Sequence, residues 1–202
     1  AHLISQGAEG PVYGGAPSDE TIIAAIKALK TRGYAVTLYP FILMDVPPGN
    51  ALPDPYGGAE QAAFPWRGRI TCHPAAGQPG SVDKTADAAA QVAAFFGTAS
   101  AGDFSVSGGT VSYSGPSGDW GFNRFILHHA ALAAAAGGVE SFIIGSEMRG
   151  LTQIRSDTVS YPAVARLKTL AGQARALLGP AVNISYAADW SEYHSYRPGD
   201  GS

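Results

Sequence analysis

The sequence predicts an α/β protein in which helices wrap a parallel β-sheet. A helical pattern, a glycine and an apolar strand pattern follow one another three times, over residues 22–43, 120–145 and 162–188. Strands that alternate with helices in this way are typical of a parallel sheet covered by helices. The 26 glycines and 14 prolines follow no period, which indicates long ordered loops between these units.

The first unit begins with a helix and continues into a strand. Ser18 can cap the helix, apolar residues recur at helical spacing over 22–29, and Gly33 ends it. The run 34–43 is almost entirely apolar, with β-branched and aromatic members. Such a run predicts a strand that is covered on both faces.

The middle of the chain carries a long loop and an inserted hairpin. Proline and glycine recur over residues 46–67, which predicts a long loop. A second short strand is expected over 69–73, and a helix is expected over 82–96. Two strand patterns flank Ser107-Gly108-Gly109, so residues 103–114 predict a β-hairpin that is an embellishment of the helix–strand repeat.

The last two units have clear boundaries. The second is a helix over 120–136, ended by a glycine pair, and a strand over 140–145. The third is a helix that opens near Pro162 and runs to Leu178, followed by a strand over 182–188. We expect residues 1–202 to form a single domain, and both ends read as cut from a longer protein.

Composition argues against two classes of partner. The net charge is −3 and only 14% of residues are charged, so there is no basic surplus for nucleic acid. No apolar stretch reaches the roughly 18 residues of a membrane span, and residues 1–5 lack the basic segment of a signal peptide. Cys72 is the only cysteine, so an internal disulfide is impossible, and we expect it to be a buried strand residue.

The sequence also predicts neither a metal nor a cofactor. His128 and His129 are adjacent, and neighbours on a helix point about 100° apart, so they cannot share one metal. His129 falls on the apolar stripe of its helix and is expected to be packed. Neither a dinucleotide-binding glycine pattern nor a phosphate loop is present.

Three apolar runs each stop on a carboxylate, at Asp45, Glu147 and Asp189. The C-terminal ends of parallel strands open on one face, so these acids are expected to converge there. Hydrolysis of a glycosidic bond commonly uses two carboxyl groups, one of them protonated. Glu147 is the candidate for the protonated carboxyl group, because apolar and small residues precede it. The alternative is a carboxylate at a helix start, stabilised by the helix dipole.

Five segments of the chain carry a resemblance to a known family. They read IGSEMRGLT at 144–152, YAADWSEY at 186–193, YGGAPSD at 13–19, PFILMD at 40–45 and PWRGRIT at 65–71. Together they resemble the TIM-barrel-like, glycoside hydrolase-like domain of gene transfer agent and phage tail baseplate hub proteins.

The resemblance implies an incomplete (β/α) barrel of about strands 1–5. The chain of 202 residues is also short against the roughly 250 of a full barrel. It also implies a place in a particle tail, beside other baseplate proteins. The function implied is to act on or bind cell-envelope polysaccharide. The alternatives are a catalytically inactive structural or carbohydrate-binding module of a baseplate, and a stand-alone hydrolase of another class.

The same resemblance assigns roles at the ends of two strands. Glu147 matches the general acid/base of retaining glycosidases, and Ser146 stands where that larger group has an asparagine that binds the sugar 2-hydroxyl. The nucleophile of such enzymes follows the seventh strand, which places it beyond Ser202.

Further residues are expected near Glu147. Asp189 is the internal alternative for the second carboxylate, although it can equally cap a helix or pair with Arg197. The residues expected to contact sugar, besides Ser146, are Trp190, Tyr186, Tyr193, Asp45, Trp66 and Arg67. Each has a structural alternative: packing under a loop for the aromatic residues, anchoring a loop for Asp45, and arginine–carboxylate pairing for Arg67.

Overall fold

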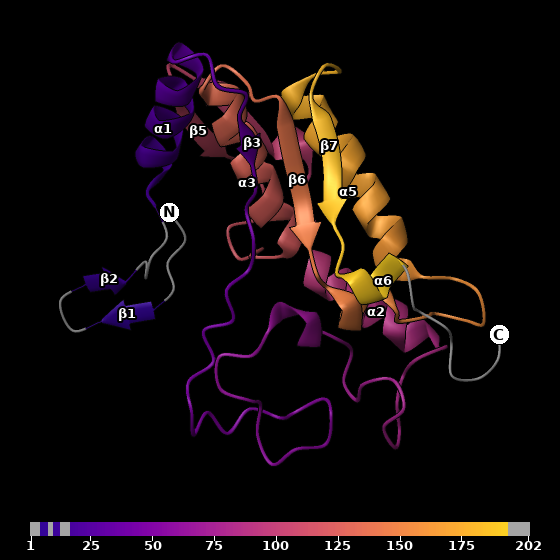
Figure 1. Cartoon of the computed structure of the whole chain (residues 1–202). Coiled ribbons are helices and arrows are strands. Elements are labelled where there is room, and N and C mark those ends of the chain that lie inside the picture. The colour runs from indigo at the N-terminus through magenta and orange to yellow at the C-terminus, as the bar shows by residue number, and fades with distance from the viewer. Residues whose placement is uncertain (1–4, 8–9, 13–16, 194–202) are drawn as a thin grey trace.

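A computed structural model of the chain describes residues 5–7, 10–12 and 17–193. Its centre is a parallel sheet of three strands in the order β3-β6-β7 (Figure 1). These strands are β3 (Thr37–Leu38), β6 (Ser141–Ser146) and β7 (Asn183–Ala187). Thr37 lies opposite Ser141, and Phe142 lies opposite Ile184. The mixed α/β class with a parallel sheet is therefore confirmed.

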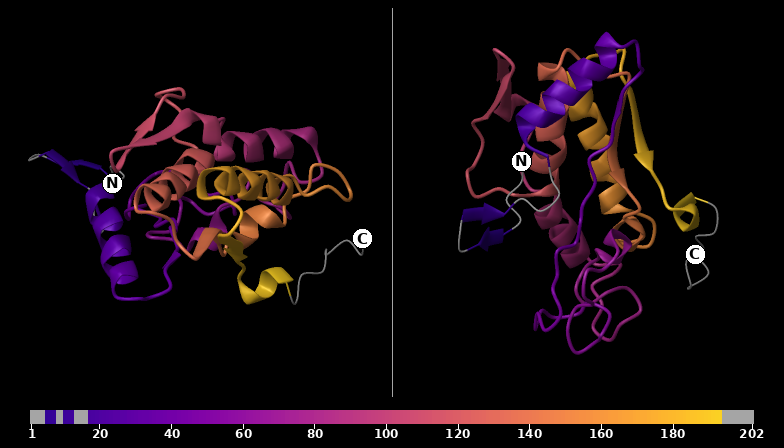
Figure 2. Two further views of the ribbon diagram at one scale, coloured as in Figure 1. Left: turned by 90° about the horizontal axis from the view of Figure 1, so that it is seen from above. Right: turned by 60° about the vertical axis from the view of Figure 1, so that its left-hand side comes forward.

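The main helices lie beside one another on one side of the sheet (Figure 2). They are α1 (Asp19–Thr31), α2 (Ala86–Phe96), α3 (Phe122–Ala135) and α5 (Pro162–Leu178). Helix α3 packs against α5, and α5 packs against α2. Ser18 caps α1 by accepting a hydrogen bond from the Thr21 N–H, and Pro162 occupies the first turn of α5, as predicted.

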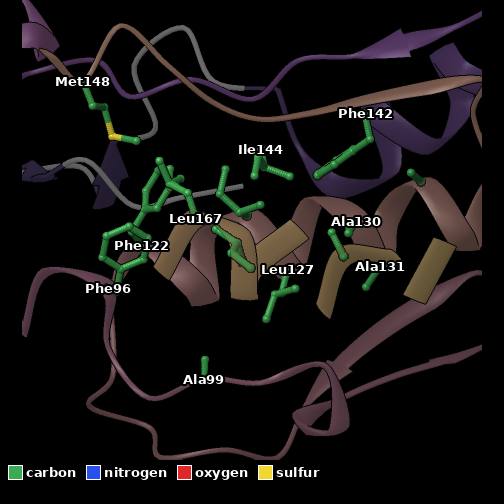
Figure 3. Packing of buried hydrophobic residues seen from close by; sticks show 14 of the residues in the cluster. Phe96, Ala99, Phe122, Leu127, Ala130, Ala131, Phe142, Ile144, Met148 and Leu167 are labelled. Atoms are coloured by element: carbon green, nitrogen blue, oxygen red, sulfur yellow. The ribbon is translucent and has the colours of Figure 1, made fainter. Parts of the chain in front are cut away.

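The core lies between these helices and the sheet (Figure 3). Phe142 and Ile144 point from β6 toward the helices, where they meet Leu127 of α3 and Leu167 of α5. Phe122 stacks with Phe95 at 5.4 Å and meets Phe96 edge-on at 5.6 Å. Burying one large apolar side chain contributes about 1.5–3 kcal/mol, so this interface holds the sheet to the helices.

Smaller elements complete the fold. Strands β4 (Phe104–Ser107) and β5 (Thr110–Tyr113) form the predicted hairpin, which packs on α3. A second antiparallel pair, β1 (Ser5–Gly7) and β2 (Gly10–Val12), was not predicted. The short helices are η1 (Arg67–Arg69), η2 (Ala101–Asp103), α4 (Arg149–Thr152) and α6 (Trp190–Tyr193). None of the helices in the described part of the chain is long and apolar enough to cross a membrane.

The prediction for the first strand is wrong in two respects. The strand over 34–43 shrinks to Thr37–Leu38, and the run is not covered on both faces. Tyr39, Phe41 and Leu43 are exposed, Leu43 at 69%, while the intervening Pro40 is buried. The helices cover only one side of this run, so its alternate residues form an exposed apolar surface, which we call the uncovered face.

The strand predicted over 69–73 is also wrong. The chain there forms η1 and then irregular structure, and Cys72 is buried but not in a strand. The Gln91 side chain of α2 explains this, because it takes up both backbone groups of His73. Its Oε1 accepts from the His73 N–H at 2.8 Å, and its Nε2 donates to the His73 carbonyl at 3.0 Å. These groups are therefore satisfied without a sheet partner.

Candidate functional site

The site lies where β6 and β7 end. In Figure 1 the long segment between β3 and α2 lies beyond these two strand ends, and it carries η1. Helix α4 starts directly after β6 and packs against η1. We call the group formed by Ser146, Glu147, Trp66 and Arg67 the rim site.

Glu147 has an unusual backbone conformation. Its φ is +51°, a region that residues with a side chain rarely adopt, and it directly follows β6. The pairing of β6 with β7 shifts register between Ile143 and Ser146, which marks a bulge just before this residue. The Glu147 N–H nevertheless donates to the Ala187 carbonyl of β7 at 2.9 Å. Strained backbone of this kind is concentrated at functional sites.

Two donors from the η1 segment hold the Glu147 carboxylate. Arg67 Nη2 donates to its Oε2 at 2.6 Å, and Trp66 Nε1 donates to the same oxygen at 3.1 Å. Arg67 Nε also donates to Ser146 Oγ at 3.0 Å, so one guanidinium joins both residues of the strand end. The side chains of Arg67 and Glu147 are 17% and 35% exposed. The carboxylate is therefore held by a charge-assisted hydrogen bond, while part of the Glu147 side chain stays open to solvent.

Two glycines let η1 approach this closely. A Cβ on Gly150 of α4 would lie 2.7 Å from the carbonyl oxygens of both Gly68 and Ile70. A Cβ on Gly68 would lie 2.4–2.5 Å from three atoms of the Trp66 ring. Gly150 thus permits the contact between α4 and η1, and Gly68 permits Trp66 to fold back toward Glu147.

Aromatic rings flank the rim site. The Arg67 guanidinium lies 4.8 Å from the centre of the Phe41 ring, a cation–π contact. Trp66 is 43% exposed although its indole N–H is bound, and Phe41 is exposed as well. Exposed aromatic faces beside fixed polar groups are the chemistry that binds the apolar face of a sugar ring.

Asp189 is engaged in a local structural contact. Its Oδ2 accepts hydrogen bonds from the Ser191 N–H at 3.0 Å and from the Ser191 hydroxyl. In return Glu192 Oε2 accepts from the Asp189 N–H at 2.7 Å, the reciprocal pattern of a helix capping box. The hydrogen bonds from Ser191 hold the pKa of Asp189 below its ordinary value. The helix-capping alternative for this residue thus has direct geometric support.

Tyr186 lies under the rim site and joins its two strand ends. Its hydroxyl accepts from the Met148 N–H at 2.8 Å and donates to Glu192 Oε1 at 2.9 Å. Thr152 of α4 donates to the same Glu192 oxygen at 2.7 Å. Burial raises the pKa of the Tyr186 phenol well above its ordinary value, and the Glu192 charge acts in the same direction.

The remaining predicted residues are more scattered. Trp190 is 68% exposed on α6, and Asp45 is exposed in the segment after β3. Tyr193 ends α6, but its side chain lies outside the described residues. Arg197 and residues 13–16 of the motif at 13–19 also lie outside them. The structure thus brings together Ser146, Glu147, Trp66 and Arg67.

An open groove of about 560 Å³ lies elsewhere, between α5 and β7. Its lining is mainly apolar and includes Val164, Leu167, Ala171 and Ile184. Tyr186 and Glu192 reach it from the rim side, but Glu147 does not line it. Among the described residues β7 is an edge strand of the sheet, so the groove lies beside a sheet edge.

Sequence reasoning missed several contributors. Glu192, Thr152 and Phe41 were not singled out, although the spacing Asp189-x-x-Glu192 is a capping signal. Arginine–carboxylate pairing was the structural alternative for Arg67, but nothing in the sequence named Glu147 as its partner. Gly68 and Gly150 gave no signal, because their role depends on contacts between segments far apart in sequence.

The histidines take part in packing and pairing. His128 Nε2 lies 3.0 Å from an Asp19 carboxylate oxygen, which joins α3 to α1. His129 is buried as predicted, and this burial lowers its pKa from 6.5 to about 4. Within residues 17–193 and the two N-terminal strands, no three His, Cys, Asp or Glu side chains cluster as metal ligands do.

Comparison with known proteins supports the family resemblance over part of the chain. Residues 120–202 match the family described as the GTA TIM-barrel-like domain. The matched part contains β6, Glu147, α5, β7 and α6, and so the strand ends of the rim site. The motifs at 13–19, 40–45 and 65–71 lie outside the matched residues. No curated protein matches the chain.

Proposed function

From the match of residues 120–202 to the GTA TIM-barrel-like domain we infer that the chain is related to gene transfer agents and phage-like particles. From this premise we propose that the chain is part of a glycoside hydrolase-like barrel in a particle tail protein, and that its rim site engages cell-envelope polysaccharide. The observation that carries the proposal is Glu147 itself. A strained, partly exposed carboxylate lies at a strand end between Arg67 and Trp66.

The local geometry supports contact with a sugar. Trp66 and Phe41 offer exposed rings, and Arg67 and Ser146 fix the polar side of the site. A sugar ring stacks its apolar face on an aromatic ring while its hydroxyls bind charged groups. Trp190, Tyr193 and Asp45 are proposed to extend the contact surface, with Tyr186 beneath it.

An incomplete barrel accounts for two exposed apolar surfaces. At Tyr39 and Leu43 the uncovered face would be the inner surface of a closed barrel, whereas Phe41 stays at the rim beside Arg67. The edge strand β7 of the described sheet and its apolar groove would receive the next strand and helix. In this proposal further β/α units of the same tail protein cover both surfaces.

Within such a barrel, Glu147 is the proposed general acid/base of a retaining reaction. A retaining enzyme places its nucleophile about 5 Å from this group. The proposal assigns that role to a carboxylate of a later strand, with Asp189 as the internal alternative. Asp189 is less suited, because its carboxylate is bound to Ser191.

A second function, glycan binding without cleavage, is favoured by one contact. The Arg67 guanidinium donates to Glu147 Oε2 at 2.6 Å, whereas a general acid must present its carboxyl group to the leaving oxygen of the sugar. If this ion pair persists when sugar is bound, the rim site grips the polysaccharide without hydrolysing it.

One experiment separates these functions. Wild-type chain, and the longest natural polypeptide that contains it, are incubated with peptidoglycan fragments and lipopolysaccharide oligosaccharides. New reducing ends that vanish in Glu147→Gln support catalysis, and saturable binding without new ends supports the binding module. Glu20→Gln, an exposed glutamate of α1, is the matched control and is expected to behave as wild type. The proposal is overturned if both polypeptides fail to bind and fail to cleave these glycans.

A further inference from the structure

We propose that Tyr186, together with Glu192, is a positioning unit that sets the direction of the Glu147 side chain. The inference rests on the proposed function of the rim site for its biological meaning. Its geometry stands independently of that function.

Two peptide groups flank the Cα of Glu147, and β7 binds both. The N–H before its Cα belongs to Glu147 and donates to the Ala187 carbonyl at 2.9 Å. The N–H after its Cα belongs to Met148 and donates to the Tyr186 hydroxyl at 2.8 Å. The first contact fixes the rotation about φ and the second the rotation about ψ. Both partners belong to β7, so β7 fixes the backbone conformation of Glu147, which follows the neighbouring strand β6.

Such restraint is needed because the conformation is unfavourable. The left-handed region is unfavourable for a residue with a side chain, and surrounding contacts must offset this cost. The two hydrogen bonds that flank Glu147 supply such contacts. Without the Tyr186 hydroxyl, the peptide after Glu147 would be free to relax toward ordinary geometry.

The hydroxyl can accept from Met148 only if its own proton has another destination. Glu192 Oε1 accepts the hydrogen bond from the Tyr186 hydroxyl at 2.9 Å, and Thr152 donates to the same oxygen at 2.7 Å. Glu192 Oε2 is held by the Asp189 N–H at 2.7 Å. The carboxylate is therefore fixed by donors from α4 and the start of α6, and it fixes the phenol in turn. Since burial raises the pKa of Tyr186, the phenol stays protonated and this direction of donation persists.

The glycine of the strand makes room for this arrangement. A Cβ on Gly145 would lie 3.3 Å from Cε2 of Tyr186 and 3.0 Å from the Met148 methyl. Gly145 stands within the bulge of β6. The bulge, the glycine and the tyrosine thus act together on the turn that carries Glu147.

The test reads the Trp66 indole N–H, which donates to Glu147 and so reports where that carboxylate lies. The ¹⁵N–¹H indole signal of Trp66 is assigned with Trp66→Phe, and its shift on losing the charged acceptor is defined with Glu147→Gln. Tyr186→Phe removes only the hydroxyl. We expect it to move the Trp66 signal toward the Glu147→Gln position and to weaken glycan binding about tenfold.

Three controls separate positioning from general destabilisation. Tyr34→Phe removes an exposed phenol hydroxyl elsewhere, and Val182→Ala trims a buried residue before β7. Both should leave the Trp66 signal in place. If Tyr186→Phe fails to fold, Glu192→Gln tests the same unit, because it removes the charge that holds the phenol.

The outcomes distinguish this inference from the proposed function. A folded Tyr186→Phe or Glu192→Gln variant with an unmoved Trp66 signal overturns the inference. A moved signal in a protein that binds no glycan supports the positioning unit and contradicts the proposed function.

Discussion

At the scale of single residues, Glu147 is the best example of what the sequence can and cannot predict. Its place at the end of an apolar run was readable from the chain, since parallel strands end on one face. Its partner Arg67 lies in η1, far away in sequence, so their 2.6 Å contact depends on tertiary packing. The positive φ of Glu147 has no sequence signal either, because glycine is the usual residue in that conformation.

Gly68→Ala tests how Trp66 reaches the rim site. The added Cβ would overlap the Trp66 ring at 2.4–2.5 Å, so the ring must turn away from Glu147. We expect the Trp66 indole N–H to lose its protection from hydrogen exchange and glycan binding to fall by about tenfold. Gly118→Ala is the matched control, since a Cβ there meets nothing within 4 Å. Unchanged protection in Gly68→Ala would mean that Trp66 is not held in this way.

At the scale of elements, those whose ends carry local sequence signals were predicted correctly, and those that depend on long-range contacts were not. Helix α5 begins at Pro162 and ends at Leu178, as predicted, because its proline and the following glycine are local signals. The strand over 69–73 was wrong, because Gln91 of a helix satisfies the backbone of His73. Short apolar runs are ambiguous in sequence, and the available partners decide their structure.

The packing of α4 on η1 gives a prediction for Gly150. An alanine there would press its Cβ to 2.7 Å from two backbone oxygens, which cannot rotate away. We expect Gly150→Ala to lower the free energy of unfolding by about 1–3 kcal/mol. It should also release Arg67 from Glu147. Chemical denaturation measures the loss of stability, and the Trp66 indole signal reports the change at Glu147.

Gly172→Ala is the opposite case and serves as the control. Gly172 lies inside α5 and a Cβ there meets nothing within 4 Å. Alanine restricts the unfolded chain, so we expect a gain of about 0.5–1 kcal/mol in the free energy of unfolding. A loss of stability in this variant, or no loss in Gly150→Ala, would contradict the packing described for these helices.

At the scale of the whole molecule, one buried histidine links stability to pH. His129 Nδ1 lies 2.8 Å from the Phe125 carbonyl, and burial lowers the pKa of His129 from 6.5 to about 4. Between these values the unfolded chain binds a proton that the folded protein excludes. Stability is therefore full above about pH 6.5 and falls by about 3 kcal/mol as the pH drops toward 4.

This pH dependence can be measured by denaturation of wild type and His129→Gln between pH 7 and pH 4. We expect the variant to lose a large part of the slope. His73→Gln, which replaces an exposed histidine, should retain it. Equal slopes in wild type and His129→Gln would show that other groups cause the acid sensitivity.

At this scale, the sequence could not predict which faces of the sheet are covered. The parallel sheet and its alternation with helices follow from the sequence pattern and were predicted, whereas the strand order β3-β6-β7 was not. The exposure of Tyr39, Phe41 and Leu43 was not, since an apolar run looks the same whether its second face is covered or open.

The most direct test of the central claim is a titration of the ¹⁵N-labelled chain with peptidoglycan and lipopolysaccharide oligosaccharides, observed at the indole N–H groups of its tryptophans. The account predicts a saturable shift of the Trp66 signal that Glu147→Gln weakens and Glu20→Gln does not. A Trp66 signal that stays fixed at every glycan concentration would contradict it.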